Sequence, residues 1–427
     1  ILGGLLGVFL TVVFRKYFCV EMHDCYPFPS GRAAAEVLSS NEGSKAKLMV
    51  FSGLVGIIYD FILNTMGWWQ EVIDTTTFKW GQFVEHSLKL NMSLDTDIAL
   101  LGIGYFTGIR YAAIIAAGSF FASFVAIPVV YYLGGDHHMV VKGQEMLLAD
   151  APVHAVFLAY VRHIGIGMLA MAGVIGLLSM AKVVKGVVVN AMKDIFTSGA
   201  SAQVSIRGER DIPMSYLGLG IVATIILFTI FFHLTFAENL AQTIIAFFIV
   251  SILSILLSVV GISSIAFTGN EPVSGMTIFM ILVAGVALTA SGMGGQLGML
   301  AVLMMAAFLC TTIGVAGNFM SEMKVAHMTG ATPAKMQQWQ LVSIVLTGIV
   351  SVGVVMLLNH AYGFVGDGAL NAPQANAMAA IVEPLMNGMD APWPLYMAGA
   401  FLAIIMWMVG VPPLAFALGV YLPMEIN

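Results

Sequence analysis

Long apolar runs separated by short polar stretches dominate the chain. Ten runs have the composition of membrane spans, the first of them cut short, and they lie at 1–14, 48–69, 113–133, 164–181, 214–236, 241–262, 275–291, 297–316, 341–358 and 394–411. The stretch 96–110 is shorter and glycine-rich, and we interpret it as a broken span. The pattern predicts an all-α polytopic membrane protein with about eleven crossings, because a barrel would instead show short alternating strands.

Composition supports a membrane protein. Of 427 residues, 59% are hydrophobic and only 9% are charged, whereas about a quarter of the residues in a soluble domain are charged. The net charge of −6 argues against nucleic acid as a partner. Three cysteines form no metal-ligand or redox spacing, and we expect no cofactor. The chain begins inside an apolar run and ends without a polar tail, so we expect it to be part of a longer protein.

Lysine and arginine are unequally divided between the two sets of connections. If 15–47 faces the cytoplasm, the turn at Arg110 and the stretches 182–213, 263–274 and 317–337 share that side. That side holds thirteen basic residues and the opposite connections hold three, Lys79, Lys89 and Lys142. Because basic connections are retained in the cytoplasm, we predict a multi-pass cell-membrane protein with 15–47, 182–213 and 317–337 inside.

Two similar stretches interrupt the apolar pattern. "YPFPSGR" (26–32) and "EPVSGMT" (271–277) each place serine and glycine after proline and before an apolar helix. Serine at such a place is typical of a helix N-cap. The repetition predicts a duplication, with a first transmembrane half at 1–213 and a second at 214–427. We expect the two halves to be related by a pseudo-two-fold axis along the membrane normal.

Broken helices in corresponding halves are a sequence pointer to a transporter's binding site. The N–H groups at Ser30-Gly31 and at Ser274-Gly275 would suit an anion such as a carboxylate. Arg32 follows the first break directly and would clamp a carboxylate, or would only anchor the cytoplasmic side. The alternative for both stretches is a surface turn that caps the next helix.

Few ionisable residues lie within or beside the spans, where they are costly and therefore often functional. Asp60 lies in the middle of 48–69, and Glu271 stands beside the second break, so both are candidates for proton coupling. Asp60 is equally interpretable as a structural group that faces water or pairs with Arg110. Glu322 and Lys324 either contact substrate or form a local ion pair. His137 and His138 are interpreted as a solvated outer loop rather than a metal site.

Several stretches resemble the oligopeptide transporter superfamily, in order along essentially the whole chain. They are "YPFPSGRAAAEVL" (26–38), "GIGYFTGIR" (102–110), "PVSGMTI" (272–278), "AGNFMSEMKVAHMTGATPAKMQQ" (316–338), "LNHAYGF" (358–364) and "PPLAFALGVYLP" (412–423). The match is closest to the bacterial branch, which is related to the plant yellow-stripe-like metal-chelate carriers. The resemblance implies a duplicated fold of about sixteen transmembrane helices that carries out proton-coupled symport of small peptides or metal chelates.

The resemblance also extends the candidate substrate site. Tyr105 in the second stretch, and Asn318 and Glu322 in the fourth, join the residues at the two breaks as substrate-binding candidates. This chain departs from the family pattern at Glu271, where the bacterial relatives have asparagine, and at Asn318, where they have an acid. One carboxylate is gained and one is lost, which leaves substrate and coupling ion open.

Other functions remain as alternatives. A metal-chelate or glutathione carrier would use the same architecture with a different substrate. A membrane-embedded enzyme would need a nucleophile and base within the spans, and no such motif is present. A passive channel would need no carboxylate at a helix break. We therefore expect a secondary transporter for small oligopeptides, working by alternating access in a lipid bilayer, with a homo-oligomer left open.

Overall fold

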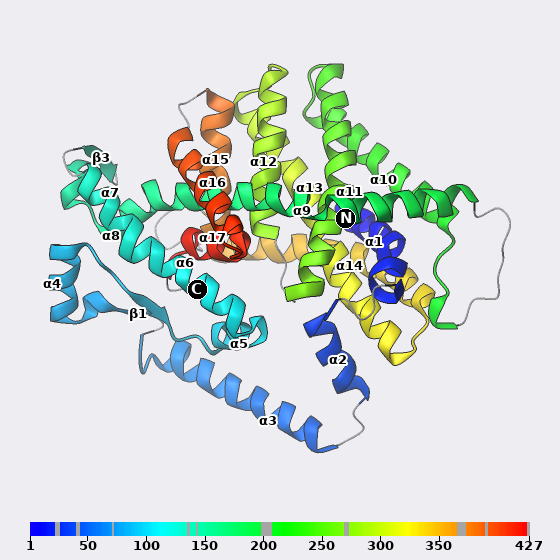
Figure 1. Cartoon of the computed structure of the whole chain (residues 1–427), viewed down its shortest axis with the longest axis horizontal. Coiled ribbons are helices and arrows are strands. Elements are labelled where there is room, and N and C mark those ends of the chain that lie inside the picture. The colour runs from blue at the N-terminus through cyan, green and yellow to red at the C-terminus, as the bar shows by residue number, and fades with distance from the viewer. Residues whose placement is uncertain are drawn as a thin grey trace. The chain divides into compact units, whose positions relative to one another are not determined.

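The computed structural model describes residues 1–21, 26–39, 43–70, 72–134, 137–141, 144–197, 207–268, 273–364, 373–388 and 392–424. These residues are almost entirely helical, which confirms the predicted all-α class (Figure 1). The chain divides into two compact units. Unit 1 comprises residues 1–39 and 176–391, and unit 2 comprises residues 40–175 and 392–427.

Unit 1 is built from helices alone in its described residues. Its helices are α1 (Leu2–Arg15), α2 (Pro29–Ser39), the second part of α9 (Arg162–Thr197), α10 (Met214–Thr235), α11 (Leu240–Thr268), α12 (Val273–Ala290), α13 (Gly295–Thr329), α14 (Pro333–Ala361) and α15 (Pro373–Asn387). A π-helical turn, Lys16–Glu21, continues α1. Helix α13 is the centre of the unit, because α1, α2, α11, α12 and α15 all pack against it.

The seam between α1 and α13 shows how the helices of unit 1 are held together. A Cβ atom at Gly7 would lie 2.6 Å from the Thr312 carbonyl oxygen, so only glycine permits this backbone approach. The Thr312 hydroxyl donates to the Gly3 carbonyl over 3.0 Å, and the Thr11 hydroxyl donates to the Ala316 carbonyl over 3.1 Å. Small residues and interhelical hydrogen bonds are what hold helices together in lipid, where apolar burial between helices gains little.

Unit 2 combines helices with two short antiparallel hairpins. Its elements are α3 (Gly43–Asp60), β1 (Val72–Asp74), α4 (Lys79–Leu88), β2 (Ser93–Asp95), α5 (Ile98–Thr107), α6 (Ile109–Phe121), α7 (Ile127–Gly134), β3 (His138–Val141), β4 (Gln144–Leu147), α8 (Val153–Val156), the first part of α9, α16 (Trp393–Met408) and α17 (Pro413–Tyr421). Ile73 pairs with Leu94 in one hairpin, and Met139 pairs with Met146 in the other. Gly108, at a φ of 82°, separates α5 from α6, so the glycine-rich stretch 96–110 does break.

In the described part of the chain, seven helices are long and apolar enough to cross a membrane. They are Leu2–Glu21, Ile109–Gly134, Val153–Gly176, Met214–Thr235, Leu240–Ala266, Gly295–Thr329 and Pro333–Ala361. Three shorter apolar helices, Val50–Leu63, Met276–Ala290 and Trp393–Met408, also match predicted spans. The protein is therefore a multi-pass membrane protein, and the count of eleven crossings stays a prediction.

Three expectations about the connections are wrong. The stretch 182–213 was expected to be a loop, but α9 continues to Thr197. The stretch 317–337 was expected to be a loop, but α13 continues to Thr329 and α14 begins at Pro333. The span expected at 164–181 begins earlier, because the helix that carries it starts at Val153. Hydropathy detects the apolar part of a helix only, so charged residues at one end hide its true length.

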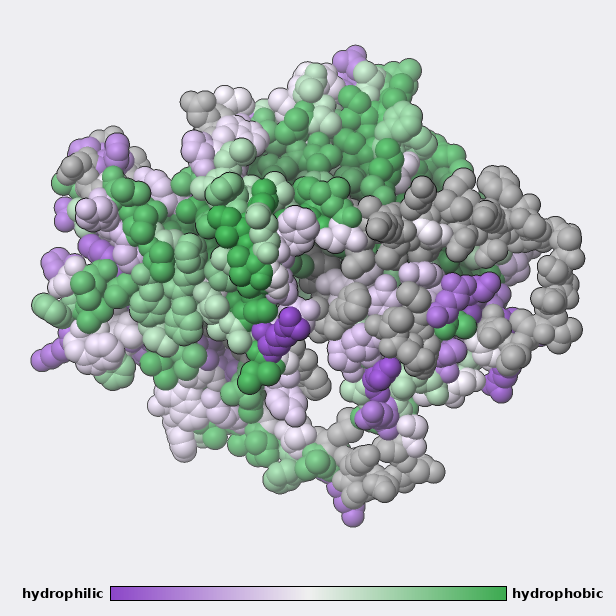
Figure 2. All heavy atoms as spheres, in the orientation of Figure 1, coloured by the Kyte–Doolittle hydropathy of each residue, from purple (hydrophilic) through white to green (hydrophobic). Residues whose placement is uncertain are grey.

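Apolar side chains cover outer surfaces that would face water in a soluble protein. On α10, Leu219, Leu227 and Leu234 are exposed, and on α14 the exposed residues include Leu346, Ile349 and Leu357. Figure 2 shows a continuous hydrophobic surface over α10 and α11. Apolar surface of this extent is expected where helices face lipid.

The predicted halves, 1–213 and 214–427, describe a duplication. A duplication is a likeness between two parts of a chain, which the division into compact units does not test. The halves and their pseudo-two-fold axis therefore remain a prediction.

Candidate functional site

The first helix break lies at Phe28, directly before α2. Phe28 is buried and has a φ of 42°, in the left-handed region that non-glycine residues rarely adopt. Its backbone N–H donates to the Ala266 carbonyl over 2.8 Å, and its own carbonyl accepts from the Arg32 N–H at the same distance. The break is thus tied both to its own helix and to the end of α11. Strained backbone of this kind is concentrated at functional sites.

The start of α2 lies against α13. A Cβ atom at Gly31 would be 3.0 Å from the Ser321 Oγ and 3.1 Å from the Ser321 carbonyl oxygen, so glycine allows the close approach. The hydroxyls of Ser30 and Ser321 are 3.3 Å apart. The expectation that Ser30 is the N-cap is wrong, because the helix already begins at Pro29 and the hydroxyl faces the neighbouring helix.

A buried cation lies beneath the break. Lys324 is 0% exposed, and its Nζ is 5.3 Å from the centre of the Phe28 ring. Two further buried aromatic rings continue this contact: the Tyr26 centroid lies 6.4 Å from that of Phe28, and the Phe18 centroid lies 5.1 Å from that of Tyr26. An ammonium group over an aromatic face is attracted by the ring quadrupole, most strongly when water is excluded.

Three predicted site residues are exposed on the flank of this contact. Asn318 and Glu322 lie four residues apart on α13 and therefore share one face of the helix, next to the face that carries Ser321. Arg32 is exposed on the first turn of α2. The flank thus offers an amide, a carboxylate and a guanidinium within two helices that pack together.

The second break precedes α12. Ser274 and Gly275 occupy the first turn of α12, which begins at Val273. Glu271 lies outside the described residues. Helix α12 packs against α11 and α13, and α11 also contacts α2, so the helices on either side of both breaks belong to one packed group in unit 1.

The other two predicted site residues belong to unit 2. Asp60 is exposed at the end of α3 and precedes a π-helical turn, Phe61–Met66. Tyr105 is 84% exposed on α5. The structure does not assign either residue to the group around the first break, and their roles stay predictions.

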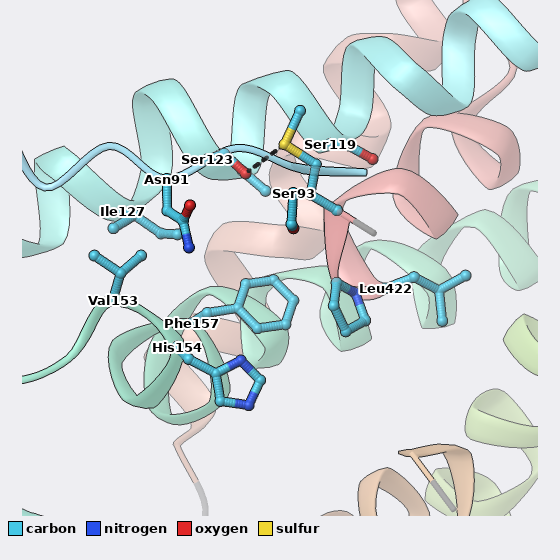
Figure 3. A pocket seen from close by; sticks show the side chains of 12 residues that line it. Asn91, Ser93, Ser119, Ser123, Ile127, Val153, His154, Phe157 and Leu422 are labelled. Carbon is cyan, nitrogen blue, oxygen red and sulfur yellow. Dashed lines mark hydrogen bonds between the residues drawn. The ribbon is translucent and has the colours of Figure 1, made fainter. Parts of the chain in front are cut away.

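A small polar pocket lies in unit 2 (Figure 3). It is lined by Asn91, Ser93, Ser119, Ala122, Ser123, Ile127, Val153, His154, Phe157, Leu422, Pro423 and Met424. The Ser123 hydroxyl donates to the Met424 sulfur over 3.6 Å, and the Ser119 hydroxyl to the Gly419 carbonyl over 3.2 Å. Its volume of about 50 Å³ accommodates a few water molecules, whereas a drug-sized ligand needs several hundred. The pocket therefore has the size of a water site rather than of a peptide site.

Sequence reasoning missed two residues of the first break, because neither Phe28 nor Ser321 was singled out. Lys324 was considered as a substrate contact or as a member of a local ion pair, but in a stretch that was expected to be a loop. The available signal was the three-residue spacing of Ser321 and Lys324, which places both toward one side of a helix. That signal becomes readable only once 317–329 is known to be helical.

Comparison with known proteins agrees with the architecture. The family model described as "OPT oligopeptide transporter protein" matches residues 1–427. A protein of Haemophilus influenzae described as a "Putative oligopeptide transporter" is 24% identical over 468 aligned positions, which cover all of this chain and 71% of the relative. The chain therefore belongs to the oligopeptide transporter family.

Proposed function

We propose that the protein carries small oligopeptides across the cell membrane together with protons, by alternating access. The observation that carries the proposal is the contact at the first break, where the start of α2 meets Ser321 of α13 above the buried Lys324. Membership of the oligopeptide transporter family supports a transporter. The choice of peptide and of proton coupling rests on the chemistry of the break.

A peptide is a zwitterion, and the break offers partners of both signs. The N–H groups at the start of α2 and the exposed Arg32 favour a carboxylate. The carboxylate of Glu322 favours an ammonium, and the hydroxyls of Ser30 and Ser321 accept or donate hydrogen bonds to a peptide group. A transporter also needs a part that moves, and the strained backbone at Phe28 is a suitable hinge.

Proton coupling is assigned to Glu271, with Asp60 as the second candidate. A carboxylate beside a helix break in an apolar environment is the kind of group that gains and loses a proton during a transport cycle. Replacing one of these carboxylates by an amide of the same size removes the titrating group and keeps the shape. Such a variant therefore distinguishes a loss of proton coupling from a loss of substrate binding.

Competition for uptake tests the substrate class. Proteoliposomes take up a labelled tripeptide in the presence of the unlabelled free acid, its C-terminal amide, an N-acetylated form, glutathione or a carboxylate-rich metal chelate. We expect the free acid to compete best and both blocked peptides to compete at least tenfold less well. Equal competition by the amide contradicts carboxylate capture, and preferential competition by the chelate favours a metal-chelate carrier.

A further inference from the structure

A second group of polar side chains lies inside a span of unit 2, away from the residues discussed so far. Arg162 and His163 follow a π-helical turn, Phe157–Val161, in the interior of the apolar helix Val153–Gly176. Such turns recur at functional positions in helices. Both residues lie just before the expected span 164–181, where they would need no special explanation.

Two polar atoms on aromatic side chains of this group are buried and lack a hydrogen-bond partner among the described residues. They are the Nδ1 of His163 and the hydroxyl of Tyr396, a side chain that is only 6% exposed. The two rings are in contact, with centroids 5.6 Å apart and planes inclined by 57°. A buried polar atom without a partner costs free energy, so two of them on rings that are in contact indicate a shared guest.

The packing around the pair limits the size of that guest. A Cβ atom at Gly167 would overlap the Tyr396 carbonyl oxygen, and one at Gly399 would overlap the Ile164 carbonyl oxygen, so α9 and α16 are in backbone contact here. Helix α17 closes the third side, because a Cβ at Gly165 would lie 2.7 Å from the Tyr421 Cα. Packing this close leaves no room for a peptide carboxylate with its attached chain, so the guest that we infer is a single water molecule.

Two segments that line the polar pocket of Figure 3 are near this pair in the sequence. Phe157 lines the pocket and precedes His163 by six residues, which is about 9 Å along a helix. Leu422 also lines the pocket and follows Tyr421, whose ring lies 5.3 Å from the Arg162 guanidinium carbon. Along α9 the pocket lining is therefore within about two helical turns of the pair.

We propose that His163 and Tyr396 hold a buried water molecule between them and, with it, form a way station for the cotransported proton in unit 2. This step rests on the proposed proton-coupled transport. Hydronium on the pocket side gives a proton to the imidazole nitrogen and becomes water, and the imidazolium later returns that proton to water on the other side. Tyr396 orients the bound water through its hydroxyl. The imidazole is regenerated when the proton leaves, so the step needs no other reactant.

The charges around His163 suit brief occupation by a proton. On its own helix the neighbouring titratable groups are Arg162, Tyr160 and His154, while α16 contributes Tyr396 alone and α17 contributes Tyr421 alone. Helix α7, which packs on the preceding π-helical turn, adds only Tyr131 and Tyr132. The fixed charge of Arg162 opposes a second positive charge next to it.

The water site is tested by thermal unfolding in detergent. Tyr396→Phe removes the hydroxyl and keeps the ring, and Tyr421→Phe, in the same seam, is the matched control. If the hydroxyl binds water, Tyr396→Phe lowers the Tm by more than Tyr421→Phe does. An unchanged or raised Tm for Tyr396→Phe shows that the hydroxyl had no guest and overturns the proposal.

The proton role is tested by comparing two modes of transport in proteoliposomes. Tyr396→Phe and His163→Gln should lose at least tenfold of peptide accumulation driven by a pH gradient, and should keep peptide counterflow, which requires no net proton movement. The proposed proton station is wrong if both variants accumulate peptide as wild type does. It is also wrong if counterflow falls as much as gradient-driven accumulation. Failure of the wild-type protein to accumulate peptide instead contradicts the proposed function, and the Tm comparison then decides the water site by itself.

Discussion

The backbone N–H of Phe28 donates to the carbonyl oxygen of Ala266 over 2.8 Å, although 238 positions separate the two residues along the chain. Ala266 lies two residues before the end of α11, and α12 follows with Ser274 and Gly275 in its first turn. The bond therefore links the first break to the helix that leads into the second. A site built from both breaks requires such proximity, and each prediction about the breaks below depends on it.

Gly31 is expected to tolerate no larger side chain. In Gly31→Leu the new atoms would meet Ser321 and push α2 away from α13, which we expect to cost about 1–3 kcal/mol of stability and most of the uptake activity. Ala34→Leu, at an exposed position of the same helix, is the control and should behave like wild type. Thermal unfolding and peptide uptake measure the two effects. If Gly31→Leu takes up peptide normally, the close contact between Gly31 and Ser321 is not part of the transport site.

Lys324 is expected to be required for transport rather than for insertion. Lys324→Met keeps most of the side-chain volume and removes the charge beneath Phe28, so we expect uptake to fall at least tenfold while the protein still inserts and purifies normally. The control is Lys335→Met, which removes an exposed lysine. If both variants transport alike, Lys324 serves only to pack the base of the break.

Gly7, in the helix seam of unit 1, is matched by a control at Gly53, on α3 of unit 2. Gly7→Ala places a Cβ 2.6 Å from a backbone oxygen of α13 and should cost about 1–3 kcal/mol, because neither helix can yield easily. Gly53→Ala meets nothing within 4 Å and should be neutral or stabilising by about 0.5–1 kcal/mol. Denaturation in mild detergent compares the two variants. Equal stabilities would mean that α1 and α13 are packed less closely than described.

Asp211 is expected to hold the end of α1. Its carboxylate accepts from Arg15 over 2.6 Å and from the Gln337 amide over 2.5 Å, and Arg15 is only 1% exposed. Replacing the carboxylate by an amide in Asp211→Asn should destabilise the protein by about 3–5 kcal/mol, because a buried guanidinium loses its counter-charge. Asp150→Asn, at an exposed position, should change stability little. A small effect at both positions would show that Arg15 does not depend on this pair.

Glu271 is expected to couple transport to protons. Glu271→Gln should abolish accumulation driven by a pH gradient and leave membrane insertion and peptide counterflow intact, because the amide keeps the shape and cannot titrate. Asp60→Asn is the comparison. If Glu271→Gln still accumulates peptide fully under a pH gradient, Glu271 is not the coupling residue, and Asp60 becomes the leading candidate.

Much of the fold was predictable because lipid imposes simple rules. The apolar runs at 214–236 and 341–358 appear as α10 and α14, since a backbone in hydrocarbon must satisfy its hydrogen bonds within a helix. The site was less predictable. Hydropathy does not say that α13 continues through the charged stretch around Lys324, or that a π-helical turn places His163 inside a span. Both features depend on packing between segments that are distant in the sequence, and the spacing of apolar residues along one segment carries no information about such packing.

The most direct test of the account is accumulation of a labelled tripeptide in proteoliposomes with and without an imposed pH gradient. We predict accumulation above the external concentration when the side from which peptide is taken up is acidic, and its collapse when a protonophore is added. Uptake that merely equilibrates, at the same rate with and without the gradient, would contradict proton-coupled peptide transport.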